Sequence, residues 1–321
     1  MRRIKTCTVF FLLLCLLLNL AGCAAAQKPL RVTLVLKTVT EVAEFWGTLL
    51  SGVEKAAEEY GVELKVLTSP REIDIDKQIE LIRQVTADKP DVMILSAADY
   101  DRCAEATEEA IAAGIGVVAI DTDVNAAGRA CFVGSNSYEI GLEMGRAMAS
   151  YLPEGGKVAV IQHMLTTTTG IERTRGVLDA LNEAGNIEIL GSFCCDNSTE
   201  QAQTITTELL SADPEIRGFV CTNEVCNVGA ANALVDLGLG GKVYVVGCDN
   251  SQRQIQFLEQ NIIQAIVTQR PFNMGYMAVQ QAVRVANGEQ TDDFVEVSCV
   301  LITRENMYTQ ENQKLLFPVL R

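Results

Sequence analysis

Short apolar runs alternate with longer segments of helical periodicity along nearly the whole chain from Arg31. Val32 to Leu36 is typical of a strand, and Val42 to Tyr60 repeats apolar residues on one helical face until Gly61 ends it. Further strands are expected at 62–67, 92–95, 116–120, 157–161, 187–192, 217–221, 243–247 and 263–268. Further helices are expected at 74–87, 101–113, 137–151, 171–184, 199–211, 224–236 and 271–287. Because several strands are apolar throughout, helices must cover both faces of the sheets, and the pattern predicts an α/β fold with parallel sheets.

Polar residues follow several of these strands directly. In an open parallel sheet, ligands bind at the edge formed by the carboxyl ends of the strands, so these residues are candidates for a binding site. They are Lys37, Asp121, Asn223, Asp249 and Gln269, and Arg173 joins them near a predicted helix start. Carboxylates, amides and basic groups all hydrogen-bond to hydroxyls, but the set contains no nucleophile paired with a base. The pattern favours a binding protein over an enzyme, with no cofactor and no metal.

The chain is acidic, with a formal net charge of −15 over 321 residues, a length that suits two domains. Nucleic acid and anionic headgroups require clustered basic residues, and no segment of the sequence has them. Eight cysteines follow Cys23, without C-x-x-C spacing or a neighbouring histidine that would suggest a zinc site. Most of them lie in apolar segments, which is typical of buried small side chains, and disulfides remain an open alternative.

The first residues have the form of an export signal. Three basic residues precede the apolar run Val9 to Leu20, which is too short to span a bilayer. The run ends in Leu20-Ala21-Gly22-Cys23, which resembles the lipobox of bacterial lipoproteins. This resemblance implies a signal peptide at 1–22, a lipid on Cys23 as the new N-terminus, and a tether at 23–30. An ordinary signal peptide cut near residues 24–26 is the alternative.

Eight short motifs occur in order between residues 31 and 305. The first half contains Lys37…Phe45-Trp46…Gly52…Ala56, Asp74…Gln78, Gly114-Ile-Gly-Val-Val-Ala-Ile-Asp-Thr-Asp123 and Phe132-Val-Gly-Ser-Asn136…Gly141. The second half contains Glu172-Arg173-Thr-Arg175-Gly176, Thr222-Asn223-Glu224, Val245-Val-Gly-Cys-Asp249 and Gln269-Arg-Pro271…Gly275. The series resembles the type I periplasmic binding proteins, in particular the ribose and sugar-binding group of ABC importers.

The resemblance implies two Rossmann-like lobes with parallel sheets, joined by three crossover strands, with the ligand enclosed between them. The first lobe would comprise residues 31–135 plus 270–298, and the second 136–269 plus 299–321. The implied ligand-binding residues are Lys37, Phe45, Trp46, Asp121, Arg173, Asn223, Asp249 and Gln269, with Gln269 at the hinge. Lys37 matches a lysine of family members that bind hexoses or related polyols.

Several of these residues also fit a purely structural role. The aromatic pair fits the core of a helix, and Asp121, Asn223 and Asp249 fit helix N-caps. Arg173 fits a surface ion pair with Glu172 or Glu183. His163, the only histidine, is expected to be structural or at the rim of the cleft, and Thr166 to Thr169 beside it to form a loop.

Two departures from the family pattern concern the ligand. Thr122 stands where ribose-type members have arginine, and Ala43-Glu44 stands where they have asparagine and proline. Both departures argue against ribose and leave the family resemblance intact.

The sequence therefore predicts a lipid-anchored extracytoplasmic protein that captures a sugar or sugar-like polyol and delivers it to an ABC importer. A monomer that binds no nucleic acid is expected. The alternative is a subunit that presents a bound sugar, nucleoside or furanose signal to a membrane sensor kinase or chemoreceptor. A hydrolase would need a nucleophile or an acid–base pair, and a transcription regulator would need an N-terminal helix-turn-helix, where this chain has a lipobox.

Overall fold

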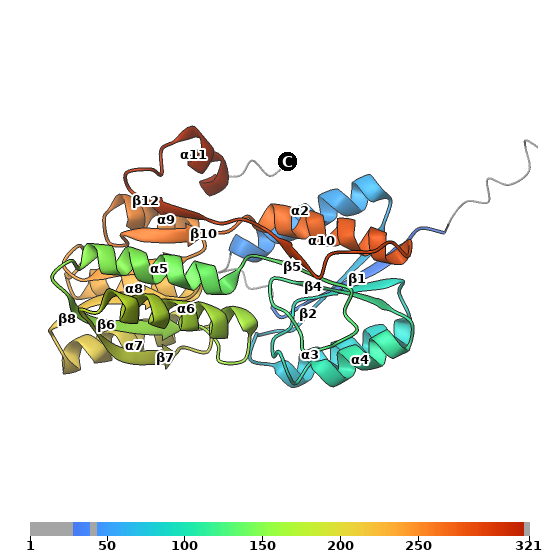
Figure 1. Ribbon diagram of the computed structural model, residues 1–321, viewed down its shortest axis with the longest axis horizontal. Coiled ribbons are helices and arrows are strands. Elements are labelled where there is room, and N and C mark those ends of the chain that lie inside the picture. Colours follow the sequence, from blue (N-terminus) through green and yellow to red (C-terminus); the bar gives the residue numbers. More distant parts are fainter. Residues whose placement is uncertain (1–27, 39–43, 318–321) are drawn as a thin grey trace, which may run out of the picture.

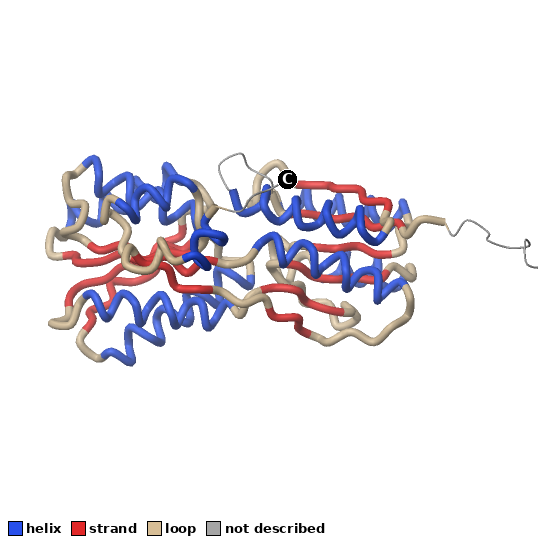
Figure 2. The backbone as a smooth tube through the Cα atoms, turned by 90° about the horizontal axis from the view of Figure 1, so that it is seen from above, coloured by secondary structure: helices blue, strands red, loops and turns tan. Residues whose placement is uncertain are grey.

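The computed structural model describes residues 28–38 and 44–317, which form two lobes lying end to end along the long axis of the molecule (Figure 1). In each lobe, helices cover both faces of a central sheet, as Figure 1 shows for the lobe with α2, α10, α3 and α4 and Figure 2 for the other lobe. This cover follows from the apolar strands, which leave no face of the sheet suited to water. The expected α/β fold with two Rossmann-like lobes is confirmed.

The first lobe combines the first part of the chain with a return segment near its end. Its strands are β1 (Arg31–Leu36), β2 (Glu63–Thr68), β3 (Val92–Leu95), β4 (Gly116–Ile120), β5 (Cys131–Gly134) and β11 (Phe294–Glu296). Its helices are α2 (Glu44–Tyr60), α3 (Ile75–Asp88), α4 (Ala104–Ala112) and α10 (Pro271–Ala286). The strands run parallel in the order β11-β5-β4-β3-β1-β2.

The second lobe repeats this plan. Its strands are β6 (Gly156–Gln162), β7 (Ile187–Cys194), β8 (Ile216–Cys221), β9 (Tyr244–Cys248), β10 (Ala265–Thr268) and β12 (Val300–Thr303). Its helices are α5 (Ser137–Tyr151), α6 (Thr168–Ala184), α7 (Thr199–Ala212), α8 (Glu224–Asp236), α9 (Gln252–Glu259) and α11 (Gln310–Leu316). The strand order is β12-β10-β9-β8-β6-β7, in which β12 pairs antiparallel with β10.

The two sheets have the same order, with β6 to β10 in the places that β1 to β5 hold in the first lobe. The chain crosses between the lobes three times, after β5, after β10 and between β11 and β12. Strands β4 and β9 therefore occupy equivalent positions, and so do the residues that follow them, Asp121 and Asp249.

A close helix pair packs on each sheet, and in each pair a glycine allows the contact. In the first lobe, a Cβ on Gly52 of α2 would lie 2.0 Å from the carbonyl oxygen of Phe272 in α10. In the second, a Cβ on Gly176 of α6 would lie 2.2 Å from the carbonyl oxygen of Tyr138 in α5. Neither position has room for a larger residue, and this packing fixes α2 and α6, whose first turns lie at the boundary between the lobes.

The structure differs from the predicted elements in a few places. Helices α9 and α11 and strands β5, β11 and β12 were not predicted, because each has only three to eight residues and is too short to show a clear period. The loop expected at Thr166 to Thr169 is wrong for its second half, because Thr167 caps α6 and Thr168 begins the helix. Arg173 consequently lies in the second turn of α6 instead of at its start.

All eight cysteines after Cys23 lie in the described part of the chain, and all are free thiols. Six of them are buried, as their apolar neighbours in the sequence predict. The expected signal peptide and Cys23 itself lie outside the described residues. In the part of the chain that is described, no helix has the length and apolar character needed to cross a bilayer.

Candidate functional site

A small cavity lies between the two lobes. It is lined by Lys37, Phe45, Trp46, Glu72, Asp121, His163, Thr169, Arg173, Asn197, Asn223, Glu224, Val225, Asp249 and Gln269. All eight ligand-binding residues expected from the sequence are in this set, although they come from positions more than 200 residues apart. The space open to the centre of a water-sized sphere is about 40 Å³, and a water needs roughly 10–15 Å³ on this measure. The cavity as it stands has room for more than one water.

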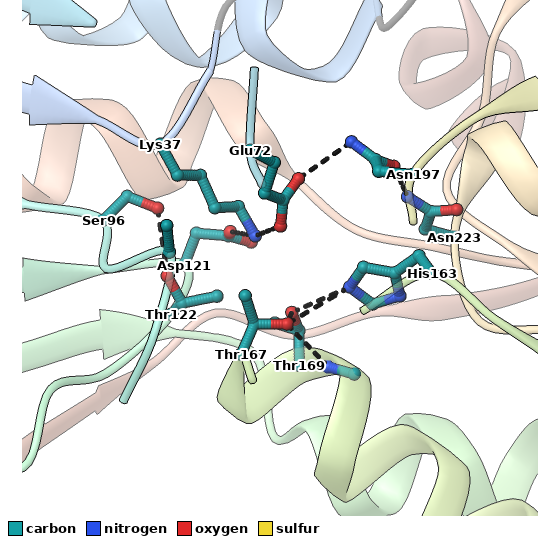
Figure 3. Close-up of polar contacts among 12 residues, drawn as sticks. Lys37, Glu72, Ser96, Asp121, Thr122, His163, Thr167, Thr169, Asn197 and Asn223 are labelled. Carbon is teal, nitrogen blue, oxygen red and sulfur yellow. Dashed lines mark hydrogen bonds and ion pairs between the residues drawn. The ribbon is translucent and has the colours of Figure 1, made fainter. Parts of the chain in front are cut away.

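Lys37 follows β1 and joins two carboxylates in the first lobe. Its Nζ lies 2.9 Å from Glu72 Oε1 and 3.3 Å from Asp121 Oδ2, and all three side chains are buried (Figure 3). Burial alone would lower the pKa of Lys37, but the charges of Glu72 and Asp121 outweigh it and raise the pKa. Lys37 is therefore charged at neutral pH and holds the two carboxylates in place.

Asp121 and Asp249 both adopt left-handed backbone conformations, with φ of 62° and 68°. Neither is a helix N-cap: no helix follows Asp121 before β5, and Ser251 caps α9. The N-cap interpretation of these two residues is therefore wrong. The tight left-handed turn ends each strand abruptly and leaves the carboxylate on the wall of the cavity.

Asp249 is the centre of the polar network in the second lobe. Its Oδ1 accepts a hydrogen bond of 2.6 Å from Gln269 Nε2, and its Oδ2 lies 3.8 Å from a terminal guanidinium nitrogen of Arg173. Arg173 is only 2 % exposed and donates to the carbonyl oxygen of Thr222 at 2.9 Å. The interpretation of Arg173 as part of a surface ion pair is therefore wrong, and Glu172 pairs with Arg175 instead.

Asn223 has the N-cap role that its sequence allowed. Its Oδ1 accepts from the backbone N–H of Cys226 at 3.0 Å at the start of α8. Its Nδ2 donates to Asn197 Oδ1 at 2.8 Å, and Asn197 Nδ2 donates in turn to Glu72 Oε2 of the first lobe at 2.8 Å (Figure 3). A chain of hydrogen bonds thus crosses the cavity from one lobe to the other.

The aromatic pair both packs in the core and lines the cavity. Phe45 and Trp46 lie in the first turn of α2, are 9 % and 5 % exposed, and belong to the apolar cluster of the first lobe. Their rings contact edge to face, with centroids 5.1 Å apart. Lys37 Nζ lies 5.6 Å from the centroid of the Trp46 ring, within range of a cation–π contact.

His163 follows β6, at the position equivalent to Lys37 in the first lobe. Its ring nitrogens lie 2.7 Å from Thr222 Oγ1 and 3.2 Å from Thr169 Oγ1 (Figure 3). Burial, together with the positive charges of Lys37 and Arg173, lowers the pKa of His163 well below its usual range, so the ring is neutral. It is buried, and it is both structural and part of the cavity wall.

Six residues of the cavity wall were not predicted to bind a ligand: Glu72, His163, Thr169, Asn197, Glu224 and Val225. Two of them had a usable signal, because Glu224 follows a proposed site residue and His163 follows a predicted strand. Glu72 and Asn197 lie in loops with no strand directly before them, and only the approach of the two lobes brings them together.

Comparison with known proteins identifies the family. Residues 33–290 match the family described as periplasmic binding protein domain. The chain belongs to this family. The D-allose-binding periplasmic protein of Escherichia coli is 26% identical over 303 residues, which cover 90% of this chain and 96% of that protein.

Two solved structures, one of a sugar transporter and one of a periplasmic solute-binding protein, are similar to this chain in both sequence and fold. A sugar transporter from Clostridium phytofermentans is 30% identical with a TM-score of 0.80, covering 85% of this chain and 98% of that one. A periplasmic solute-binding protein of an ABC transporter from Actinobacillus succinogenes 130z, with bound D-allose, is 27% identical with a TM-score of 0.80. That match covers 87% of this chain and 98% of the other. These relatives are binding and transport proteins, and none is an enzyme by its description.

Further hydrogen bonds join the lobes beside the cavity. Thr166 Oγ1 donates to the carbonyl oxygen of Ala98 at 2.8 Å, and the carbonyl oxygen of Thr166 accepts from the N–H of Tyr100 at 3.0 Å. Thr168 Oγ1 accepts from the N–H of Asp123 at 3.0 Å. The threonine segment at the start of α6 therefore helps to hold the two lobes together in this arrangement.

Proposed function

We propose that this periplasmic binding protein captures a sugar or sugar-like polyol between its lobes and delivers it to an ABC importer. The supporting observation is the composition of the cavity, where nine charged or amide side chains surround an aromatic pair. Charged and amide groups hydrogen-bond to hydroxyls, while the faces of Phe45 and Trp46 suit the C–H face of a ring. The described relatives bind D-allose or are sugar transporters, which favours the importer over the sensor that the sequence left open.

The eight residues expected from the sequence are the proposed ligand contacts. Lys37, Asp121 and the aromatic pair would hold the ligand from the first lobe, and Arg173, Asn223 and Asp249 from the second, with Gln269 at the crossover after β10. Because a ligand can hold the lobes together only by contacting both, its binding shifts the population toward the closed form. The lobes must part for a ligand to enter, since the cavity lies between them and most of its lining side chains are buried.

We also propose that hexoses or related polyols bind more tightly than ribose. Thr122 is fully buried, and its hydroxyl donates to the carbonyl oxygen of Ala97 at 2.7 Å and contacts Ser96 Oγ at 3.1 Å (Figure 3). It does not line the cavity, so the position where ribose-type members carry arginine contributes no cation here. Lys37 is the basic group that the first lobe presents to the ligand.

The intrinsic emission of Trp46 offers a direct test of this function. Trp46 is the only tryptophan, and it lies in the cavity wall, so its emission is expected to change as the lobes close over a ligand. A panel of pentoses, hexoses, inositols and nucleosides should be titrated, with calorimetry alongside. We expect saturable binding for a hexose or related polyol and weaker binding for ribose. Preference for ribose over every hexose would refute the specificity, and no saturable binding by any sugar or polyol would refute the function.

A lipid on Cys23 is the proposed means of keeping the protein at the outer side of the cell membrane, with the protein working as a monomer. The motif Leu20-Ala21-Gly22-Cys23 supports this, and it lies outside the described residues. Replacing Cys23 with Ser is expected to release the protein into the medium or periplasm, because the acidic chain has no other proposed anchor. Fractionation with a mass measurement of the N-terminus checks this. A processed Cys23→Ser protein that stays in the membrane fraction would mean that a different anchor exists.

A further inference from the structure

The charges around the cavity do not balance. Four carboxyl groups line it, those of Glu72, Asp121, Glu224 and Asp249, against the two basic side chains Lys37 and Arg173. His163 is neutral for the reasons given above. Lys37 contacts Glu72 and Asp121, and Arg173 approaches Asp249, so both basic groups have carboxylate partners. Glu224 is the one carboxyl group of the cavity without a basic partner among the described residues.

The surroundings of Glu224 leave its carboxyl group buried and without a basic partner. It is the first residue of α8, is 3 % exposed, and its Oε2 has no hydrogen-bond partner in the described part of the chain. A carboxylate at a helix N-terminus is normally stabilised by the helix dipole. Here burial, with the nearby charges of Asp249 and Glu44, instead raises the pKa of Glu224 to about 8. Without a ligand, the Glu224 carboxyl group is therefore largely protonated at neutral pH and its Oε2 is unsatisfied, and a cation beside it would favour the charged form.

A second buried polar atom also lacks a partner. Arg173 Nε has no acceptor among the described residues, and Arg173 lines the same cavity. Buried polar atoms in native proteins are normally paired, so a ligand oxygen at Arg173 and a ligand donor at Glu224 would complete both. A hydroxyl could satisfy Glu224 as a donor, but only a cation would also offset the excess of negative charge.

We propose that the cleft binds a sugar or polyol that carries one ammonium group, and that Glu224 receives this group beside Asp249. The inference rests on the proposed function, which it narrows from polyols in general to aminated ones. The ammonium lies on the side of Glu224, Asp249 and Glu44, while the positive charge of Lys37 is offset by its own two carboxylates. A ring hydroxyl or ring oxygen accepts from Arg173 Nε.

Calorimetry on the purified full chain tests the inference. Hexoses aminated at each position in turn are titrated in near-neutral buffer, and each is compared with its parent hexose. We expect at least one aminated hexose to bind about tenfold or more tightly than its parent, as a charge-assisted hydrogen bond would give. Glu224→Gln, which keeps the shape and removes the group that can become a carboxylate, should abolish this preference and change binding of the parent by less than about threefold. Glu188→Gln, which changes an exposed glutamate of β7 in the same lobe, should keep the preference.

The outcomes separate this inference from the function on which it rests. If parent hexoses bind the wild-type protein as tightly as every aminated form, the inference is overturned and the sugar-binding function stands. If Glu224→Gln binds the aminated ligand as the wild type does, Glu224 is not the recipient and the inference is likewise overturned. If no sugar or polyol binds, the proposed function itself is wrong. The comparison of ligands on the wild-type protein decides the matter even where the variant fails to fold.

Discussion

Asp249→Ala is expected to weaken ligand binding by more than about a hundredfold, because it removes an acceptor that the proposed ligand contacts through two hydrogen bonds. Such bonds to a charged group contribute about 1.5–3 kcal/mol each, which turns a micromolar ligand into one of about millimolar affinity. The loss also releases Gln269 and Arg173 from their shared partner. Calorimetric titration with the best sugar of the panel measures the effect.

Two controls keep this result separate from unfolding. Asp292→Ala changes an exposed aspartate of the first lobe and should bind as the wild type does. Asp249→Asn keeps a residue that tolerates the left-handed backbone, whereas alanine there costs about 1–2 kcal/mol of stability. Thermal unfolding should therefore show a small loss for Asp249→Ala. Unchanged affinity in a folded Asp249→Ala protein would remove Asp249 from the binding site.

Lys37→Met is expected to destabilise the fold by about 3–5 kcal/mol, because it leaves two buried carboxylates without their cation. The wild-type contribution of Lys37 is present at neutral pH: its pKa is raised in the folded state, so this stability is lost only as the pH rises above the normal range of lysine. Urea unfolding of the wild type and the variant at neutral pH and at several higher pH values measures this loss.

The double variant Lys37→Met, Glu72→Gln tests whether uncompensated charge causes the loss of stability in Lys37→Met. If the loss comes from uncompensated charge, removing one of the two carboxylates should restore part of the stability. Lys55→Met, which removes an exposed lysine from α2, serves as a control for the substitution and should leave unfolding close to the wild type. If the single and double variants are destabilised equally, the loss of stability comes from the packing of the lysine stem and not from uncompensated charge.

The sequence predicted the part of the site that follows strands. Lys37, Asp121, Asn223, Asp249 and Gln269 each follow an apolar run, and parallel strands bring such positions to one edge, so periodicity alone selects them. Arg173 was chosen for its place near a predicted helix start, whereas the aromatic pair depended on the motif series, since its helix carries no signal that distinguishes a cavity wall from a core. Phe45 and Trp46 are in fact both.

What the sequence did not predict depends on how the lobes meet. Glu72 and Asn197 have no local pattern, and their hydrogen bond exists only because loops from different lobes approach each other. The capping role of Thr167 and the inter-lobe bonds of Thr166 and Thr168 were likewise hidden in a polar run that also suits a loop. Hydrophobic periodicity predicts the helices and strands within each lobe, but it does not predict the polar contacts that form between the two folded lobes.

The left-handed turns at Asp121 and Asp249 limit how this cleft can change its preference over evolutionary time. At φ near 65°, aspartate, asparagine and glycine adopt the left-handed backbone conformation with little strain, whereas a β-branched or bulky residue is strained. Single substitutions that preserve the backbone can thus change an acceptor into an amide or delete it, and few can introduce bulk. At these two turns, the cleft would adapt to a new ligand by replacing a charged aspartate with a neutral residue while the backbone stays unchanged. A change in the shape of the cavity would come from other residues of its wall.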